Sequence, residues 1–181
     1  MTTQAIEERP ALYCGTYGKY NDGSIAGKWL YLDDYEDGEA FLKACAELHK
    51  DEQDPEFMFQ DFEYLPRCLY SESLSRQDLE QIYAWLALDA DNREIVGEYL
   101  DEVDSSTDID NIMDYYQGNI NDYKEGFMSN ETAYGWYVIE NGLFGVEIPD
   151  ALQNYIDVEA IGRDYLMDID VTESGYMFYR G

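Results

Sequence analysis

Basic residues are scarce in this sequence. It has 11 Lys and Arg against 40 Asp and Glu, which gives a formal net charge of −29 over 181 residues. From Glu94 to Gly162 the chain has 16 acidic residues and a single basic one, Lys124. Nucleic acids and anionic membranes repel a chain of this charge, so both are excluded as partners. The charge favours a basic protein surface as the partner.

Cysteine and long apolar stretches are also scarce. Cys14, Cys45 and Cys68 are an odd number at wide spacing, which predicts reduced thiols and no disulfide framework. No run approaches the roughly 18 apolar residues of a membrane-spanning helix. Met1–Pro10 is polar and lacks the apolar core of a secretory signal. These features predict a cytoplasmic protein.

The sequence lacks the motifs of catalytic, metal and cofactor sites. The one histidine, His49, ends a predicted helix, where a structural role is expected. Calcium loops that start at Asp89 or Asp108 lack the required glycine and the spacing of acids. The glycines Gly15 and Gly18 are followed by no Lys-Ser/Thr pair, so no phosphate loop is predicted. Pairs of carboxylates are expected by chance among 40 acids. We therefore predict a protein that is not an enzyme, with no cofactor and no metal.

Aromatic residues are abundant and predict a folded core. The chain has 18 Tyr, 7 Phe and 3 Trp and is 45% hydrophobic, unlike a disordered acidic tail. The pattern of apolar and polar residues predicts an α+β fold of three small modules, over residues 10–67, 69–118 and 119–181. In the first module we expect strands and one helix, with a turn-rich connection at Gly18–Gly23. The expected strands and helix are Ala11–Thr16, Gly27–Leu32, Ala40–His49 (the helix) and Phe57–Phe62.

The middle module is predicted to form three short amphipathic helices. Ser75 and Asp78 form a predicted capping pair. The apolar stripes of the three helices are Leu79, Ile82, Tyr83 and Leu86; Ile95, Val96, Tyr99, Leu100 and Val103; and Ile109, Ile112, Met113 and Tyr116. The third module is predicted to mix helices with strands. Its strands are Tyr123–Met128 and Tyr176–Tyr179, and its helices Glu131–Asn141, Ala151–Tyr155 and Val158–Arg163.

Carboxylates follow one face of the second predicted helix. Glu94, Glu98, Asp101 and Glu102 stand at i, i+4, i+7 and i+8, which places them on one side of a helix. Like charges four residues apart destabilise a helix by about 0.2–0.5 kcal/mol each. They can simply be exposed polar positions, but ordinary surfaces mix their signs. Imitation of a nucleic acid backbone is the alternative interpretation.

Two long segments resemble the ArdA antirestriction family. The C-terminal resemblance covers Tyr134–Leu166, with Tyr137, Ile139-Glu140, Gly142, Gly145-Val146, Ile148-Pro149, Leu152 to Asp157 and Gly162-Arg163-Asp164. The N-terminal resemblance covers Tyr13–Trp29, then Asp51-Glu52 and Met58–Glu63. The segment Leu69–Gly118 matches mainly in acidity and length.

The resemblance implies an elongated three-module protein that forms a curved acidic homodimer shaped like bent duplex DNA. Such a dimer occupies the DNA-binding groove of type I restriction–modification enzymes, and its genes travel on mobile genetic elements. The family's antirestriction segment corresponds to about Asn130–Gly145, near the dimer contact. In this sequence Tyr134, Tyr137 and Val138 are then the expected dimer contact, with an intramolecular core as the alternative.

The predicted mechanism is stoichiometric inhibition by DNA mimicry. The carboxylates expected to contribute are Glu94, Glu98, Asp101, Glu102, Asp104, Asp108, Asp110, Asp114, Glu131, Glu140, Glu147 and Asp150. Arg163 is expected to pair with Asp157 or Asp164. An alternative function is an acidic binding module or chaperone for basic DNA-binding proteins. A third is an acid-rich enzyme adapted to high salt, but the sequence shows no active site for it.

Overall fold

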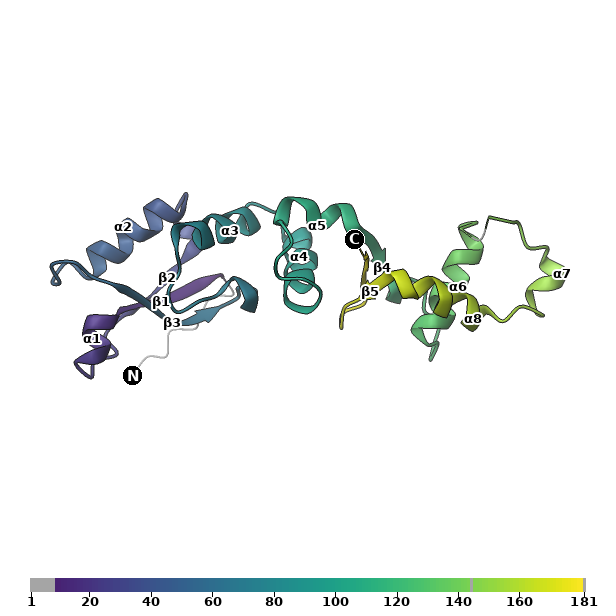
Figure 1. Ribbon diagram of the computed structural model, residues 1–181, viewed down its shortest axis with the longest axis horizontal. Coiled ribbons are helices and arrows are strands. Elements are labelled where there is room, and N and C mark those ends of the chain that lie inside the picture. The colour runs from purple at the N-terminus through teal and green to yellow at the C-terminus, as the bar shows by residue number, and fades with distance from the viewer. Residues whose placement is uncertain (1–8, 144, 181) are drawn as a thin grey trace. The chain divides into compact units, whose positions relative to one another are not determined.

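The computed structural model describes residues 9–143 and 145–180 (Figure 1). It is 49% helical and 16% strand, which confirms the α+β class. The chain divides into two compact units, Met1–Asp110 and Asn111–Gly181. The three-module division stays a prediction. Among the described residues no helix is long and apolar enough to cross a membrane. The polar N-terminal segment lies, up to residue 8, outside the described residues.

The first unit contains a three-stranded antiparallel sheet. Strand β1 (Ala11–Thr16) is central, between β2 (Lys28–Tyr31) and β3 (Phe57–Glu63). The register on β3 shifts at Tyr13/Cys14, which is a β-bulge or irregularity. All three strands lie where the apolar and aromatic runs predict them.

Helix α2 (Gly38–Leu48) packs on this sheet and completes the core of the first unit (Figure 1). It begins at Asp37, whose carboxylate accepts a hydrogen bond from the Ala40 N–H. Phe41 and Cys45 are four residues apart and are both buried, and the Phe41 ring stacks on Phe59 of β3. The predicted helix at residues 40–49 is confirmed.

The expected turn-rich connection at Gly18–Gly23 is wrong in part, because a short helix occupies most of it. Helix α1 (Tyr17–Asn21) forms because the Thr16 hydroxyl accepts a hydrogen bond from the Lys19 N–H. It is followed by Gly23, whose φ of 82° suits glycine. Two 3-10 turns also belong to this unit, η1 (Leu32–Asp34) and η2 (Arg67–Leu69).

Three helices follow, as the apolar stripes predict. They are α3 (Arg76–Leu86), α4 (Ala90–Glu102) and α5 (Ile109–Tyr115). The predicted capping box is present, since the Ser75 hydroxyl and the Asp78 carboxylate each accept the other residue's backbone N–H. The buried members of the stripes are Leu79, Ile82, Ile95, Val96, Tyr99, Leu100, Ile109 and Ile112. Tyr116 was expected on the last helix but is the first residue of a strand.

The second unit has its own antiparallel sheet, in the order β4 (Tyr116–Asn119), β6 (Tyr176–Tyr179), β5 (Ile169–Val171). Only β6 was predicted. Strand β4 carries Gly118 at a φ of 105°, where its register shifts, so it shows no clean alternation. Strand β5 has only three residues. The strand predicted at Tyr123–Met128 is wrong, because this stretch is the end of η3 (Ile120–Tyr123) and a turn.

Helix α6 (Asn130–Glu140) packs against α8 (Val158–Tyr165), and these two helices cover the core of the second unit. Their backbones meet at Gly135 and Gly162, where there is no room for a side chain. A short helix α7 (Asp150–Gln153) and the turn η4 (Leu166–Asp168) complete the unit. All three helices predicted in this region are found, within a few residues. The buried core residues are Ile120, Ala133, Tyr134, Val138, Ile169 and Met177.

Candidate functional site

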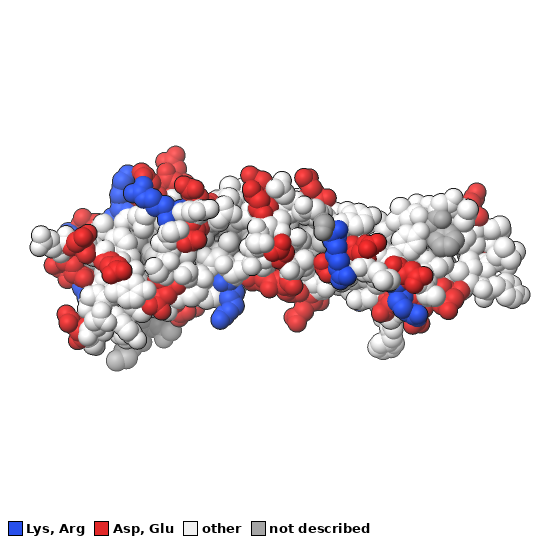
Figure 2. Space-filling model, in the orientation of Figure 1, with Lys and Arg blue, Asp and Glu red and all other residues white. Residues whose placement is uncertain are grey.

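Carboxylates dominate the charged groups on the described surface. Figure 2 shows acidic side chains on elements of both units, with only scattered basic ones on the face in view. Ten of the twelve predicted mimic carboxylates are exposed, and Glu98 and Glu131 are half-buried. The exposed ten are Glu94, Asp101, Glu102, Asp104, Asp108, Asp110, Asp114, Glu140, Glu147 and Asp150.

Helix α4 carries the first group of these carboxylates. Its Asp89 cap accepts a hydrogen bond from the Asn92 N–H, and its apolar face is buried. The opposite face therefore presents Glu94 and Glu102 to solvent, while one carboxylate oxygen of Glu98 is buried. The helix sets the spacing of these acidic residues along its axis before any partner binds.

Asp101 has a structural role that the sequence did not reveal. Its two carboxylate oxygens accept hydrogen bonds from the backbone N–H groups of Arg67 (3.1 Å) and Cys68 (2.9 Å). These donors begin the turn η2, so Asp101 joins α4 to this turn. The two partners lie 34 and 33 residues away in sequence, and no local pattern signals such a contact. Asp101 is exposed while it holds this turn.

Asp104 organises the loop between α4 and α5. Its carboxylate accepts hydrogen bonds from the Ser106 hydroxyl (2.6 Å), the Ser106 N–H (2.9 Å) and the Thr107 hydroxyl (2.9 Å). These bonds stabilise the ionised form and lower the pKa of Asp104. Asp108 accepts the Asp110 N–H in a similar local bond. An Asp followed by Ser and Thr is a recognisable signal for such a turn.

The second unit carries the remaining carboxylates. Glu131 lies in the first turn of α6, where its own backbone N–H and the Ser129 hydroxyl lower the pKa of its carboxyl. Glu140 is at the other end of the same helix, and Asp150 begins α7. Glu147 lies in the connection between these two helices.

The three residues expected at the dimer contact are mostly interior. Tyr134 is 3% exposed and Val138 is 0% exposed, and both belong to the core of the second unit. Burial raises the pKa of Tyr134 to about 12. Tyr137 packs against this core and is only partly buried. The dimer contact itself stays a prediction, and of the three residues only Tyr137 offers a substantial outer surface.

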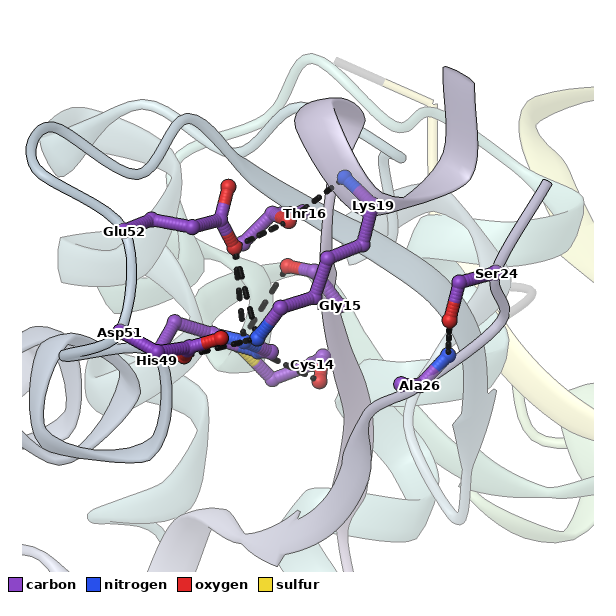
Figure 3. A network of polar contacts seen from close by, with 9 residues as sticks. All are labelled: Cys14, Gly15, Thr16, Lys19, Ser24, Ala26, His49, Asp51 and Glu52. Carbon is purple, nitrogen blue, oxygen red and sulfur yellow. Dashed lines mark hydrogen bonds and ion pairs between the residues drawn. The ribbon is translucent and has the colours of Figure 1, made fainter. Parts of the chain in front are cut away.

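His49 is buried at the end of α2, in agreement with the expected structural role (Figure 3). Its Nε2 faces the Cys14 carbonyl oxygen at 3.2 Å, so this nitrogen carries the proton. Its Nδ1 then accepts a hydrogen bond from the Lys19 ammonium at 2.9 Å. The ring therefore connects β1 with α1 and α2.

Lys19 supplies the cation of this cluster. Its Nζ lies 2.9 Å from an Asp51 oxygen and 3.5 Å from a Glu52 oxygen, and Glu52 also accepts the Thr16 hydroxyl at 2.7 Å (Figure 3). The bond to Asp51 raises the pKa of Lys19 and lowers that of Asp51. Ligand atoms of His49, Asp51 and Glu52 lie within 4.8 Å of one another, as in a metal site. The ammonium already provides the positive charge, which favours a structural interpretation.

Several basic side chains pair with carboxylates of the same unit. Arg9 pairs with Asp33 and Asp34, and Arg180 with Asp170. The expected partner of Arg163 is wrong: its guanidinium lies 3.5 Å from Glu159, one helical turn away on α8. Asp157 instead caps α8 by accepting the Ala160 N–H.

The three thiols are free, as expected. Cys14 and Cys45 are fully buried in the core of the first unit. Cys68 is exposed as a residue, yet burial of its sulfur and the neighbouring Asp101 carboxylate raise the pKa of its thiol to about 12. At neutral pH this thiol is therefore protonated and weakly nucleophilic.

The α+β fold and the excess of exposed carboxylates over basic groups place the chain in the class of strongly acidic proteins. Residues 12–178 match the protein family described as antirestriction protein (ArdA). The chain therefore belongs to the ArdA antirestriction family, whose members act against restriction–modification enzymes. The resemblance noted at both ends of the sequence is confirmed, and the match also spans the middle segment. A search of curated proteins returned no match.

Proposed function

We propose that this protein inhibits a type I restriction–modification enzyme by occupying its DNA-binding groove, with carboxylates in place of DNA phosphates. The observation that carries the proposal is the exposure of ten predicted carboxylates in a chain of the antirestriction family. The net charge of −29 is consistent with a basic groove as the target. No chemical step is required, because an occupied groove cannot take up DNA.

The energetic basis is the substitution of one set of anions for another. A DNA-binding groove contacts phosphates through Lys and Arg, and this part of the affinity is independent of sequence. The backbone that carries the carboxylates of α4 and α6 is already helical, so no backbone entropy is lost there on binding. The hydrogen bonds of Asp101 and Asp104 add to this order. Many small contributions follow, so no single carboxylate is decisive.

We also propose that the inhibitor is a homodimer. The support for this step is the exposure of several apolar side chains in the second unit besides the partly buried Tyr137, namely those of Leu143, Val146 and Tyr155. Analytical ultracentrifugation tests this step, and Tyr155→Ser should shift the protein toward monomer. The three-module division and the curved, elongated shape implied by the resemblance belong to the same proposal, and small-angle scattering tests them.

The decisive experiment is competition between the purified protein and labelled duplex DNA for a type I enzyme. We expect stoichiometric displacement, and the affinity of the protein for the enzyme should fall as salt rises, as that of DNA does, since both ligands bind through charge. Glu102→Gln should change the inhibition constant by less than about threefold, as expected for an exposed ionic contact. The triple change of Glu94, Glu98 and Glu102 to Gln should weaken inhibition much more.

Two outcomes would redirect the proposal. If one Asp→Asn or Glu→Gln change abolished inhibition in a folded protein, a discrete site would replace distributed mimicry. If the protein bound many unrelated basic proteins at low salt and failed to displace DNA from the enzyme, a chaperone for basic DNA-binding proteins would fit better.

A further inference from the structure

A cavity of about 420 Å³ lies in the second unit, where η3, α6 and α7 meet. Three half-buried aromatic side chains line it, those of Tyr123, Trp136 and Tyr137. Three exposed carboxylates line it as well, those of Asp122, Glu125 and Glu140. Only Glu140 was among the carboxylates that the sequence singled out.

The aromatic part of the cavity is held in place by the core. The rings of Tyr123 and Tyr137 have centroids 4.5 Å apart, and Tyr137 lies 5.3 Å from the buried ring of Tyr134. Burial raises the pKa of Tyr123, so its ring stays neutral at physiological pH. The rings therefore form a neutral, fixed surface that needs little rearrangement to accept a ligand.

This combination of groups selects a cation with a flat or apolar surface. Three carboxylates repel anions, and an apolar ligand would gain nothing from them. A hard metal ion would use the carboxylates but not the aromatic faces. A guanidinium uses both, because it stacks on aromatic rings and donates paired hydrogen bonds to carboxylates.

We propose that this cavity binds an arginine side chain of a basic partner protein. The inference rests on the proposed function, because it assigns one residue-specific contact within an otherwise distributed acidic surface. The target groove is expected to be rich in Arg and Lys. Lys124 also lines the cavity, and its positive charge competes with an incoming arginine.

The test uses the full-length protein and a short peptide with one arginine, with capped ends. Binding is followed by the NMR shift of the Trp136 indole N–H, which Trp136→Phe assigns among the three tryptophans. A peptide with citrulline has nearly the same shape without the charge, and a lysine peptide keeps the charge without the planar group. We expect the arginine peptide to bind tighter than either, by about three- to tenfold.

Matched variants separate the cavity from the general negative field. Glu140→Gln and Glu125→Gln should each weaken arginine binding, and Lys124→Gln should strengthen it. Glu80→Gln removes the same charge from exposed helix α3 in the first unit, and it should leave binding nearly unchanged. The proposal is overturned if citrulline binds as well as arginine, if Glu80→Gln and Glu140→Gln have equal effects, or if the Trp136 signal does not move.

Failure of this proposal is distinguishable from failure of the proposed function. If the Trp136 signal does not respond to arginine but the protein still displaces DNA from a type I enzyme, mimicry stands without the arginine cavity. If arginine binds as expected and DNA is not displaced, the cavity is real and the partner is a different basic protein.

Discussion

Gly162 on α8 is the position where a single methyl group should disrupt the second unit. A Cβ atom there would lie 1.7 Å from the Glu131 carbonyl oxygen, 2.6 Å from its carbonyl carbon and 2.8 Å from the Gly135 nitrogen. All three are backbone atoms of α6, so no rotamer change can relieve the clash. Because ordinary contact begins near 3.4 Å, Gly162→Ala must separate the helices by roughly 1.7 Å (3.4 − 1.7) at this point.

The energetic cost follows from two opposing effects. Overpacking that shifts backbone costs about 1–3 kcal/mol, and the upper end applies here because the neighbours are rigid. Replacement of a glycine by alanine in a helix interior stabilises the helix by about 0.5–1 kcal/mol. We therefore expect Gly162→Ala to destabilise the second unit by about 2 kcal/mol net. For a unit of this size that lowers Tm by roughly 8–16 °C.

Thermal melting followed by circular dichroism measures this shift, and hydrogen exchange of the α6 amides locates it. Gly97→Ala on α4 is the matched control, since its Cβ would meet side-chain atoms of Pro66 at 3.3 Å and Trp85 at 3.7 Å. That control should change stability by less than about 1 kcal/mol. Gly135→Ala should behave like Gly162→Ala, because its Cβ would lie 2.1 Å from the Val158 carbonyl oxygen. A Gly162→Ala protein that melts with the wild type would refute the close crossing of α6 and α8.

The remaining predictions concern charged groups. Asp101→Ala should lower stability by about 1 kcal/mol, as for the loss of a helix cap, and raise the rate of alkylation of Cys68 near pH 8; an unchanged rate would argue against their contact. Lys19→Met should lower the melting temperature of the first unit at neutral pH, whereas Lys19→Arg should lower it less; equal melting of Lys19→Met and wild type would contradict the cation's structural role. Arg163→Ala should cost less than about 1 kcal/mol, since its pair with Glu159 is exposed, and a larger loss in urea unfolding would point to another partner. The pKa of Asp104 is lower in the folded protein than in the unfolded chain. The ionised carboxylate therefore adds to the free energy of unfolding above the unfolded-state pKa, and this contribution is lost as pH falls through the folded-state pKa. Asp104→Asn should therefore make the free energy of unfolding depend less on pH below about pH 4.

Long periodic segments were predicted well because their signal is local. The strand Ala11–Thr16 and the helices with stripes at i, i+3 and i+4 formed where the apolar residues stand. Short strands were missed because two or three paired residues leave too little pattern, as at Ile169–Val171. Tyr123–Met128 contains aromatic and apolar residues, yet Gly126 at a φ of 60° turns the chain there.

For the candidate site, too, the sequence predicted the features that have a local signal and missed those that depend on distant contacts. The sequence predicted which helices carry carboxylates, because charge and helical spacing are both local properties. It could not separate a free carboxylate from one that caps a distant turn, as Asp101 does for residues 67 and 68. It could not decide whether Tyr134 and Val138 face inward, since both outcomes share one apolar stripe. Their burial depends on the packing of Ile120 and Met177 around them.

By itself the sequence determined the sign of the charge, the α+β class and the family, because these depend on composition and on residues near one another in the chain. The tertiary structure alone brought Lys19 to His49 and Asp51, and the aromatic rings of η3 and α6 to the carboxylates around them. Such contacts join segments that are separated along the chain, and only the packing of helices and strands sets the distances between them.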